Sequence, residues 1–116
     1  MAHDSQEINP YSAAHIPNWA ERTFARIVAA IPHLRVTYQP PTINTPMGPT
    51  QPDFRVVNGK NPGSRGRYVE VTSGGTNTLH KKEQKNKMES AGKPYNQFSG
   101  DEIVKMEKAR KRKSGV

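Results

Sequence analysis

The sequence contains no cysteine, which excludes a disulfide framework and any zinc site built on thiolates. It also lacks an apolar run near the roughly 18 residues that a membrane-spanning helix needs, and its N-terminus lacks the basic and apolar regions of a signal peptide. Its four histidines are scattered, without the close helical spacing of a zinc-binding pair. We therefore expect a cytoplasmic protein with no membrane-embedded part and no zinc chemistry.

Acidic side chains are also few relative to basic ones. The chain has 18 lysines and arginines against 10 acids, a net charge of +8 and a pI of about 10.0. Such an excess of positive charge implies an acidic partner, which could be nucleic acid, an acidic protein or an anionic membrane surface. Of these we expect nucleic acid, DNA ahead of RNA, and no membrane.

Apolar residues make up only 32% of the chain, which is enough for one core and leaves room for irregular segments. We expect a loose lead-in over residues 1–11, a single domain over 12–100 and a basic tail over 101–116. Its first part could form a helix on Ile103, Val104 and Met106, and it ends in a run of like charges at 108–113, which is typical of a mobile arm. Such an arm could bind nucleic acid, act as a localisation signal or simply raise solubility.

The hydrophobic pattern predicts a helix that begins after Asn18, with Glu21 as the second half of a capping box, and ends at Pro32. Residues 35–39, 54–57 and 68–72 read as strands, 79–91 as a lysine-rich helix and 94–98 as an edge strand. The proline-rich segment 40–52 is expected to be irregular. The order predicts an α+β fold, with a mixed sheet whose centre is antiparallel, flanked by helices.

Two acids stand at the strands in the middle of the chain. Asp53 opens one apolar run and Glu70 lies inside the next, so the pairing of these runs as a hairpin would bring both carboxylates to one edge of the sheet. Converging carboxylates repel each other unless a cation or proton lies between them. Because the chain is also strongly basic, this pair points to a divalent metal and a phosphodiester substrate. Alternatively, Asp53 is a turn residue, and Glu70 faces solvent or pairs with Arg55 or Arg67.

These residues resemble a known motif. Pro52-Asp53, then Glu70-Val71-Thr72, then a helix with Lys and Gln is similar to the PD-(D/E)xK nuclease superfamily, particularly its small VRR-Nuc and Holliday-junction-resolvase-like members. The resemblance covers 18–98 and implies a restriction-endonuclease-like αβββαβ core. It also implies a Mg²⁺- or Mn²⁺-dependent endonuclease that hydrolyses DNA or structured RNA in junction repair, on mobile elements or as a toxin. Small members of this kind form homodimers or are paired with acidic immunity proteins.

The resemblance assigns roles to particular residues. Asp53, Glu70 and the carbonyl of Val71 would bind the metal, Glu21 would assist, and Gln84 would orient the site. The family's lysine is replaced by Thr72, so a lysine from the following helix is expected to act instead: Lys82, with Lys81 and Lys85 as the other candidates. The expected phosphate contacts are Lys60, Arg65, Arg67, Lys81, Lys85 and Lys87. The missing lysine also leaves open a non-catalytic nucleic-acid-binding module on the same fold, or a basic adaptor for an acidic protein.

Overall fold

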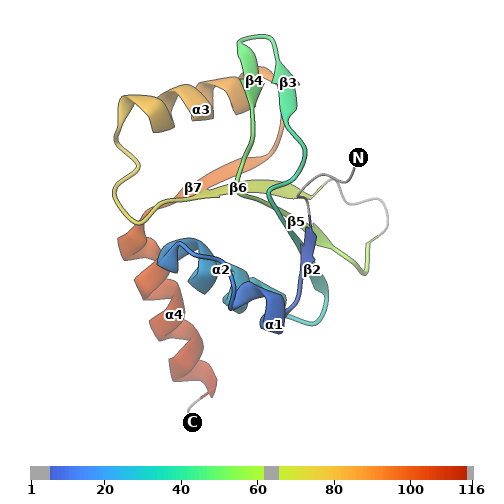
Figure 1. The fold of residues 1–116 in the computed structure, drawn as a ribbon, viewed down its shortest axis with the longest axis vertical. Helices are drawn as coiled ribbons and strands as arrows, with labels where there is room; N and C mark the ends of the chain where they lie inside the picture. Colours follow the sequence, from blue (N-terminus) through green and yellow to red (C-terminus); the bar gives the residue numbers. More distant parts are fainter. Residues whose placement is uncertain (1–5, 62–65, 115–116) are drawn as a thin grey trace.

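The computed structural model describes residues 6–61 and 66–114 (Figure 1). It is an α+β fold with a five-stranded sheet of order β1-β2-β5-β6-β7, a two-stranded sheet β3-β4 and the helices α1–α4. The strands of the larger sheet are β1 (Gln6–Ile8), β2 (Leu34–Tyr38), β5 (Phe54–Asn58), β6 (Arg67–Val71) and β7 (Tyr95–Phe98). The remaining elements are β3 (Ile43–Thr45), β4 (Gly48–Thr50), α1 (Pro10–Ala13), α2 (Trp19–Ala29), α3 (Leu79–Ser90) and α4 (Gly100–Ser114).

The larger sheet is mixed, as predicted. Strands β1, β2, β5 and β6 pair antiparallel in succession, and β7 pairs parallel with β6. Phe54 at the start of β5 lies opposite Val69 near the end of β6, and Val69 is in turn beside Asn96 of β7. The start of β5 and the end of β6 therefore share one edge of the sheet.

Both faces of the sheet are covered (Figure 1). Helices α1, α2 and α4 lie on one face, and α3 with the β3–β4 hairpin lies on the other. The hydrophobic core is on the first face, where the ring of Phe24 lies 4.9 Å from that of Phe54. Val69 and Val71 point into this core, so the alternation of a strand turns Glu70 toward α3. All three are buried, because β6 is covered on both sides.

Helix α2 begins and ends where the sequence indicates. The side chain of Asn18 accepts hydrogen bonds from the backbone N–H groups of Ala20 and Glu21, which caps the helix. The helix ends at Ala29, shortly before Pro32, and its buried face carries Phe24 and other apolar residues. The apolar period of 3.6 residues was therefore sufficient to place this helix.

The segment 40–52 is not irregular, contrary to the prediction. It forms the β3–β4 hairpin, in which Ile43 pairs with Thr50 and Thr45 with Gly48. Gly48 has a φ of +115°, a conformation that few other residues adopt, and this makes the tight reversal possible. Each strand has only three residues, too few to show an alternating pattern in the sequence.

The loose lead-in over 1–11 is also a correction for the residues that are described. Residues 6–8 form β1 on the edge of the sheet, and Ile8 is buried in the core. The side chain of Asn9 then caps α1 in a capping box with Ser12. The strand is too short and polar to be recognised before its partner β2 is known.

In the segment 101–116, the helix that could start around Ile103 is present and extends through the run of like charges that was expected to be a mobile arm, since Gly100–Ser114 is one continuous helix, α4. Ile103 is fully buried in the core and fastens α4 to α2. Glu107 reduces the repulsion between neighbouring cations through ion pairs with Arg26 at 2.9 Å, Arg110 at 3.3 Å and Lys111 at 3.7 Å. Among the helices in the described part of the chain, none has the length and apolar character needed to cross a membrane.

Candidate active site

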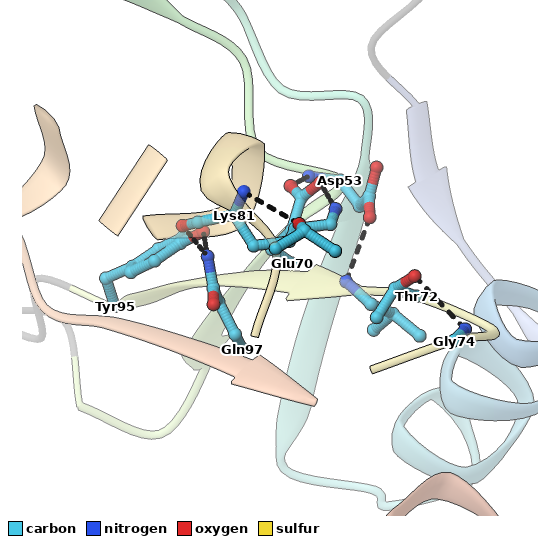
Figure 2. A network of polar contacts seen from close by, with 9 residues as sticks. Asp53, Glu70, Thr72, Gly74, Lys81, Tyr95 and Gln97 are labelled. Atoms are coloured by element: carbon cyan, nitrogen blue, oxygen red, sulfur yellow. Dashed lines mark hydrogen bonds and ion pairs between the residues drawn. The ribbon is translucent and has the colours of Figure 1, made fainter. Parts of the chain in front are cut away.

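The two acids meet where β5 starts and β6 ends (Figure 2). The backbone N–H of Asp53 donates to Glu70 Oε1 at 3.2 Å, and the backbone N–H of Val71 donates to Asp53 Oδ2 at 2.9 Å. Each carboxylate thus accepts a hydrogen bond from the backbone of the neighbouring strand. The predicted convergence of Asp53 and Glu70 is confirmed, because β5 and β6 form the expected antiparallel pair.

Lys81 is the cation at this site. Its Nζ donates to Glu70 Oε2 at 2.7 Å, and the two side chains are only 14% and 8% exposed. Lys81 lies in the first turn of α3, where the side chain of Thr78 caps the helix through the Lys81 N–H. The alternatives for Glu70, a solvent-facing position or a pair with Arg55 or Arg67, do not hold, since Glu70 is buried and bound to Lys81.

Two residues of β7 support this ion pair, and sequence reasoning missed both. Gln97 Nε2 donates to the backbone carbonyl of Lys81 at 2.7 Å and to the hydroxyl of Tyr95 at 2.9 Å (Figure 2). Tyr95 and Gln97 are two residues apart on a strand, so they share the face that α3 covers. That spacing was the available signal, but the parallel pairing of β7 with β6 was needed to show its use.

Glu21 reaches the same edge from the first turn of α2. Its Oε1 accepts a hydrogen bond from the hydroxyl of Tyr38 at 2.8 Å. Burial raises the pKa of Glu21, the bond from Tyr38 opposes this rise, and the charge of Glu70 adds to it. Glu21 is therefore close enough to the acidic pair to interact with it electrostatically.

The site has less positive than negative charge. Burial and, after it, the charge of Glu70 raise the pKa of Asp53 from 3.8 to about 7, against the opposing effects of the Val71 N–H and the charge of Lys81. Burial also raises the pKa of Tyr95, to which the charges of Glu70 and Asp53 contribute. One lysine thus compensates only part of the negative charge gathered at this edge.

The donor atoms present fit a hard divalent cation. Asp53, Glu70 and the carbonyl of Val71 offer oxygen atoms, which Mg²⁺ prefers, and Mg²⁺ commonly keeps several waters when few carboxylates bind it. Within 6–61 and 66–114 no three or more His, Cys, Asp or Glu side chains gather closely enough to hold a metal. A cation here would therefore have only the carboxylates of Asp53 and Glu70 as acidic ligands among the described residues. It would share Glu70 with Lys81.

The other residues with expected catalytic roles are placed as follows. The hydroxyl of Thr72 accepts a hydrogen bond from the N–H of Gly74 at 3.3 Å, and so belongs to the turn after β6. Lys82 and Lys85 are exposed, so Lys81 replaces Lys82 as the lysine that contacts the acids. Gln84 Oε1 is buried and has no hydrogen-bond partner among the described residues.

The expected phosphate-binding residues fall into two groups. Lys60 is exposed in the turn after β5, and Arg67 is exposed at the start of β6, where it pairs with Val56, about 10 Å along the strands from Asp53 at the usual rise per residue. Lys85 and Lys87 lie on α3, the helix that supplies Lys81. Arg65 lies outside the described residues. The α3 group is therefore the one adjacent to the acids.

Comparisons of the chain with protein-family models, with curated proteins and with solved structures found no match.

Proposed function

We propose that the protein is a Mg²⁺- or Mn²⁺-dependent endonuclease of the PD-(D/E)xK type that hydrolyses phosphodiester bonds in DNA or structured RNA. The observation that carries the proposal is the meeting of Asp53, Glu70 and Lys81 from three separate elements. The order α2-β2-β5-β6-α3-β7 supports a restriction-endonuclease-like core, with the β3–β4 hairpin inserted between β2 and β5.

Each residue has a role in this proposal. A cation bound by Asp53, Glu70 and the Val71 carbonyl would polarise the scissile phosphate and lower the pKa of a bound water. Lys81 brings to Glu70 the positive charge that Thr72 cannot supply, and so offers stabilisation for charge that develops on the phosphate. Glu21 adds negative charge close by, and the exposed Lys85 is available to a backbone phosphate.

The second candidate function is a non-catalytic nucleic-acid-binding module. It is favoured by the engagement of both Glu70 oxygens, one with Lys81 and one with the Asp53 N–H, because this pattern satisfies the carboxylate without a metal. The net charge of +8 suits either function. Such a module would bind nucleic acid with an affinity that falls strongly as salt rises, and it would cleave no substrate.

Cleavage assays with matched variants separate the two functions. Supercoiled plasmid, a branched DNA and tRNA are incubated with wild type, Glu70→Gln, Asp53→Asn and Glu89→Gln, each with EDTA, Mg²⁺ or Mn²⁺. Glu89 is an exposed acid on the same helix as Lys81 and serves as the control. We expect metal-dependent cleavage by wild type and Glu89→Gln, and retained binding without cleavage for Glu70→Gln. Cleavage that persists in both Glu70→Gln and Asp53→Asn would refute the nuclease assignment.

The proposal includes two kinds of protein partner. A homodimer would cut both strands of a duplex, and an acidic inhibitor or immunity protein would complement the net charge of +8. Sedimentation of the protein alone, and with a cleavable duplex in EDTA, tests for the dimer. A monomer in both conditions would exclude the dimer at the concentrations used.

A further inference from the structure

A groove runs between α2 and α4, which pack against each other on the face of the sheet that α3 does not cover (Figure 1). Its volume is about 340 Å³, at the lower end of the range of ligand pockets. All of its lining residues belong to these two helices, and Asp53, Glu70 and Lys81 are not among them. The groove is therefore separate from the candidate active site, and the catalytic proposal gives it no role.

One end of the groove is apolar and exposed. Trp19 of α2 is 42% exposed and Val104 of α4 is 40% exposed, and both line the groove. These are two of the five large apolar side chains that are exposed in the described part of the chain, and they meet here from different helices. The indole ring lies close to Gly100 at the start of α4, where the absence of a side chain leaves room for it. A ring held in this way loses little conformational entropy when a partner covers it.

The other end of the groove is basic, and its cations are Arg26, Lys108 and Lys111. Lys108 and Lys111 follow Val104 by one and two helical turns, so the three side chains share one face of α4 over about 10 Å. The only acid in the lining is Glu107, which is 14% exposed and forms ion pairs with Arg26 and Lys111. The groove thus presents an apolar end and a positively charged end.

This separation of apolar and charged ends favours a peptide as the occupant. A peptide can carry an apolar side chain at one position and carboxylates one and two turns away. A nucleic-acid strand has a phosphate at every nucleotide, so it would also bring charge to the apolar end. A second copy of this chain would bring a net charge of +8 to a groove that is already basic, and the two would repel each other.

We propose that the α2–α4 groove binds an acidic amphipathic segment of a partner protein. One large apolar side chain of the segment inserts between Trp19 and Val104, where its burial supplies affinity. The carboxylates of the segment pair with Lys108 and Lys111 and set its orientation. The proposal does not rest on the nuclease assignment. Because the lining excludes the central acids, such a partner would recruit the protein without blocking the candidate active site.

Trp19 is the only tryptophan of the chain, so its fluorescence reports directly on the groove. Wild type is titrated with capped helical peptides that lack tryptophan and carry one leucine, with two glutamates placed one and two turns either after or before it. Matched peptides replace the leucine by serine, or the glutamates by glutamine. The protein variants are Val104→Ser, Lys108→Glu and, as the control, Lys105→Glu. Lys105 is exposed on α4 but does not line the groove.

We expect one of the two leucine peptides to shift the emission of Trp19 to shorter wavelength, because the leucine displaces water from the indole. The serine peptide should bind at least about tenfold more weakly, and Val104→Ser should lose about threefold in affinity for the leucine peptide. Lys108→Glu should lose about fivefold or more, and Lys105→Glu, with the same net charge, less than about twofold. With the glutamine peptide Lys108→Glu should lose little, which identifies the pair that interacts.

All three substituted residues are exposed, so the variants should melt at the temperature of wild type, which excludes misfolding as the cause. Equal losses in Lys108→Glu and Lys105→Glu would overturn the proposal, since net charge alone would then attract the peptide. An unchanged emission with both peptide orders would also overturn it.

The remaining outcomes assign the groove to another occupant. A larger emission shift with a single-stranded oligonucleotide or with phosphatidylserine vesicles at the same salt would refute the proposal in favour of nucleic acid or a membrane surface. A shift on raising the protein concentration alone would refute it in favour of a second copy. Since no measurement here involves cleavage, this proposal and the nuclease proposal can fail separately.

Discussion

Lys81 Nζ lies 2.7 Å from Glu70 Oε2, although Lys81 belongs to α3 and Glu70 to β6. The residue two positions after Glu70 is Thr72, which carries no charge. The pair is largely buried and lies at the edge of the sheet where Asp53 also lies. Helix α3 thus supplies the positive charge that β6 does not place beside Glu70.

Substitutions of Lys81 and of its neighbour Lys82 should have different effects on cleavage. We expect Lys81→Met to lower cleavage by about 10²- to 10³-fold, because a preorganised positive charge next to the acids is removed. Lys82→Met removes the same charge from an exposed position and should change cleavage by less than about threefold. The measurement is kcat on plasmid DNA in Mg²⁺. Equal losses in the two variants would contradict the role of Lys81.

The same substitution should also reduce stability. Lys81→Met leaves Glu70 buried without its cation, which we expect to cost about 2–4 kcal/mol of unfolding free energy at neutral pH. Adding Glu70→Gln should recover most of this loss, since the uncompensated charge is then gone. Urea denaturation of the single and double variants measures both effects, and additive losses would show that the two side chains do not interact.

Asp53→Asn should stabilise the protein, and by more at higher pH. The pKa of Asp53 is raised from 3.8 to about 7 in the folded state, so the wild type loses stability as pH rises from about 4 to 7 while the unfolded state ionises. Asparagine does not ionise and still accepts the hydrogen bond from Val71. The gain should be near zero at pH 4 and reach up to about 4 kcal/mol above pH 7. Thermal unfolding from pH 4 to 8 measures it, with the exposed Asp101→Asn as the control.

Divalent metal should reduce the difference in stability between wild type and Asp53→Asn. A cation compensates the charge that disfavours ionised Asp53, so Mg²⁺ should raise the melting temperature of wild type at pH 8, with a smaller rise at pH 5.5, where Asp53 is protonated. Asp53→Asn and Glu70→Gln should show little or no rise. A similar rise in all of these proteins would indicate nonspecific binding and would count against the site.

Gln97 should position Lys81 rather than take part in the chemistry. Its amide joins β7 to the first turn of α3 through the Lys81 carbonyl, so Gln97→Leu should lower kcat about tenfold while KM changes little. Gln97→Glu lacks the donor and should not restore activity, whereas Gln97→Asn tests whether a shorter amide can. If Gln97→Leu changed stability but left kcat intact, the contact would be structural only.

Helix α4 should be required for folding, although the run of like charges at its end is typical of a mobile arm. Ile103 is fully buried, so Ile103→Ala should cost about 2–4 kcal/mol of unfolding free energy through lost burial and a cavity. Val104 is next in sequence and 40% exposed, so Val104→Ala should cost less than about 1 kcal/mol. Chemical denaturation of both variants provides the comparison. Equal, small losses would mean that α4 is not part of the folded domain.

Sequence reasoning succeeded where local periodicity is strong. The period of α2 and the alternation within β6 are properties of neighbouring residues, and together with the turn signals they were enough to place Asp53 beside Glu70. It failed for β1, for the β3–β4 hairpin and for the basic second half of α4. These short or highly polar segments are stabilised by distant partners, such as Val36 opposite Ile8 and the core around Ile103.

The sequence by itself determined the order of the main elements, the antiparallel centre of the sheet and the facing of the two acids, because each depends on patterns a few residues long. Only the tertiary structure decided which lysine reaches Glu70. Lys81, Lys82 and Lys85 are alike in sequence, and the packing of α3 against the sheet, with Gln97 on the Lys81 carbonyl, turns Lys81 inward and leaves the other two exposed. That choice depends on contacts between residues far apart in the chain.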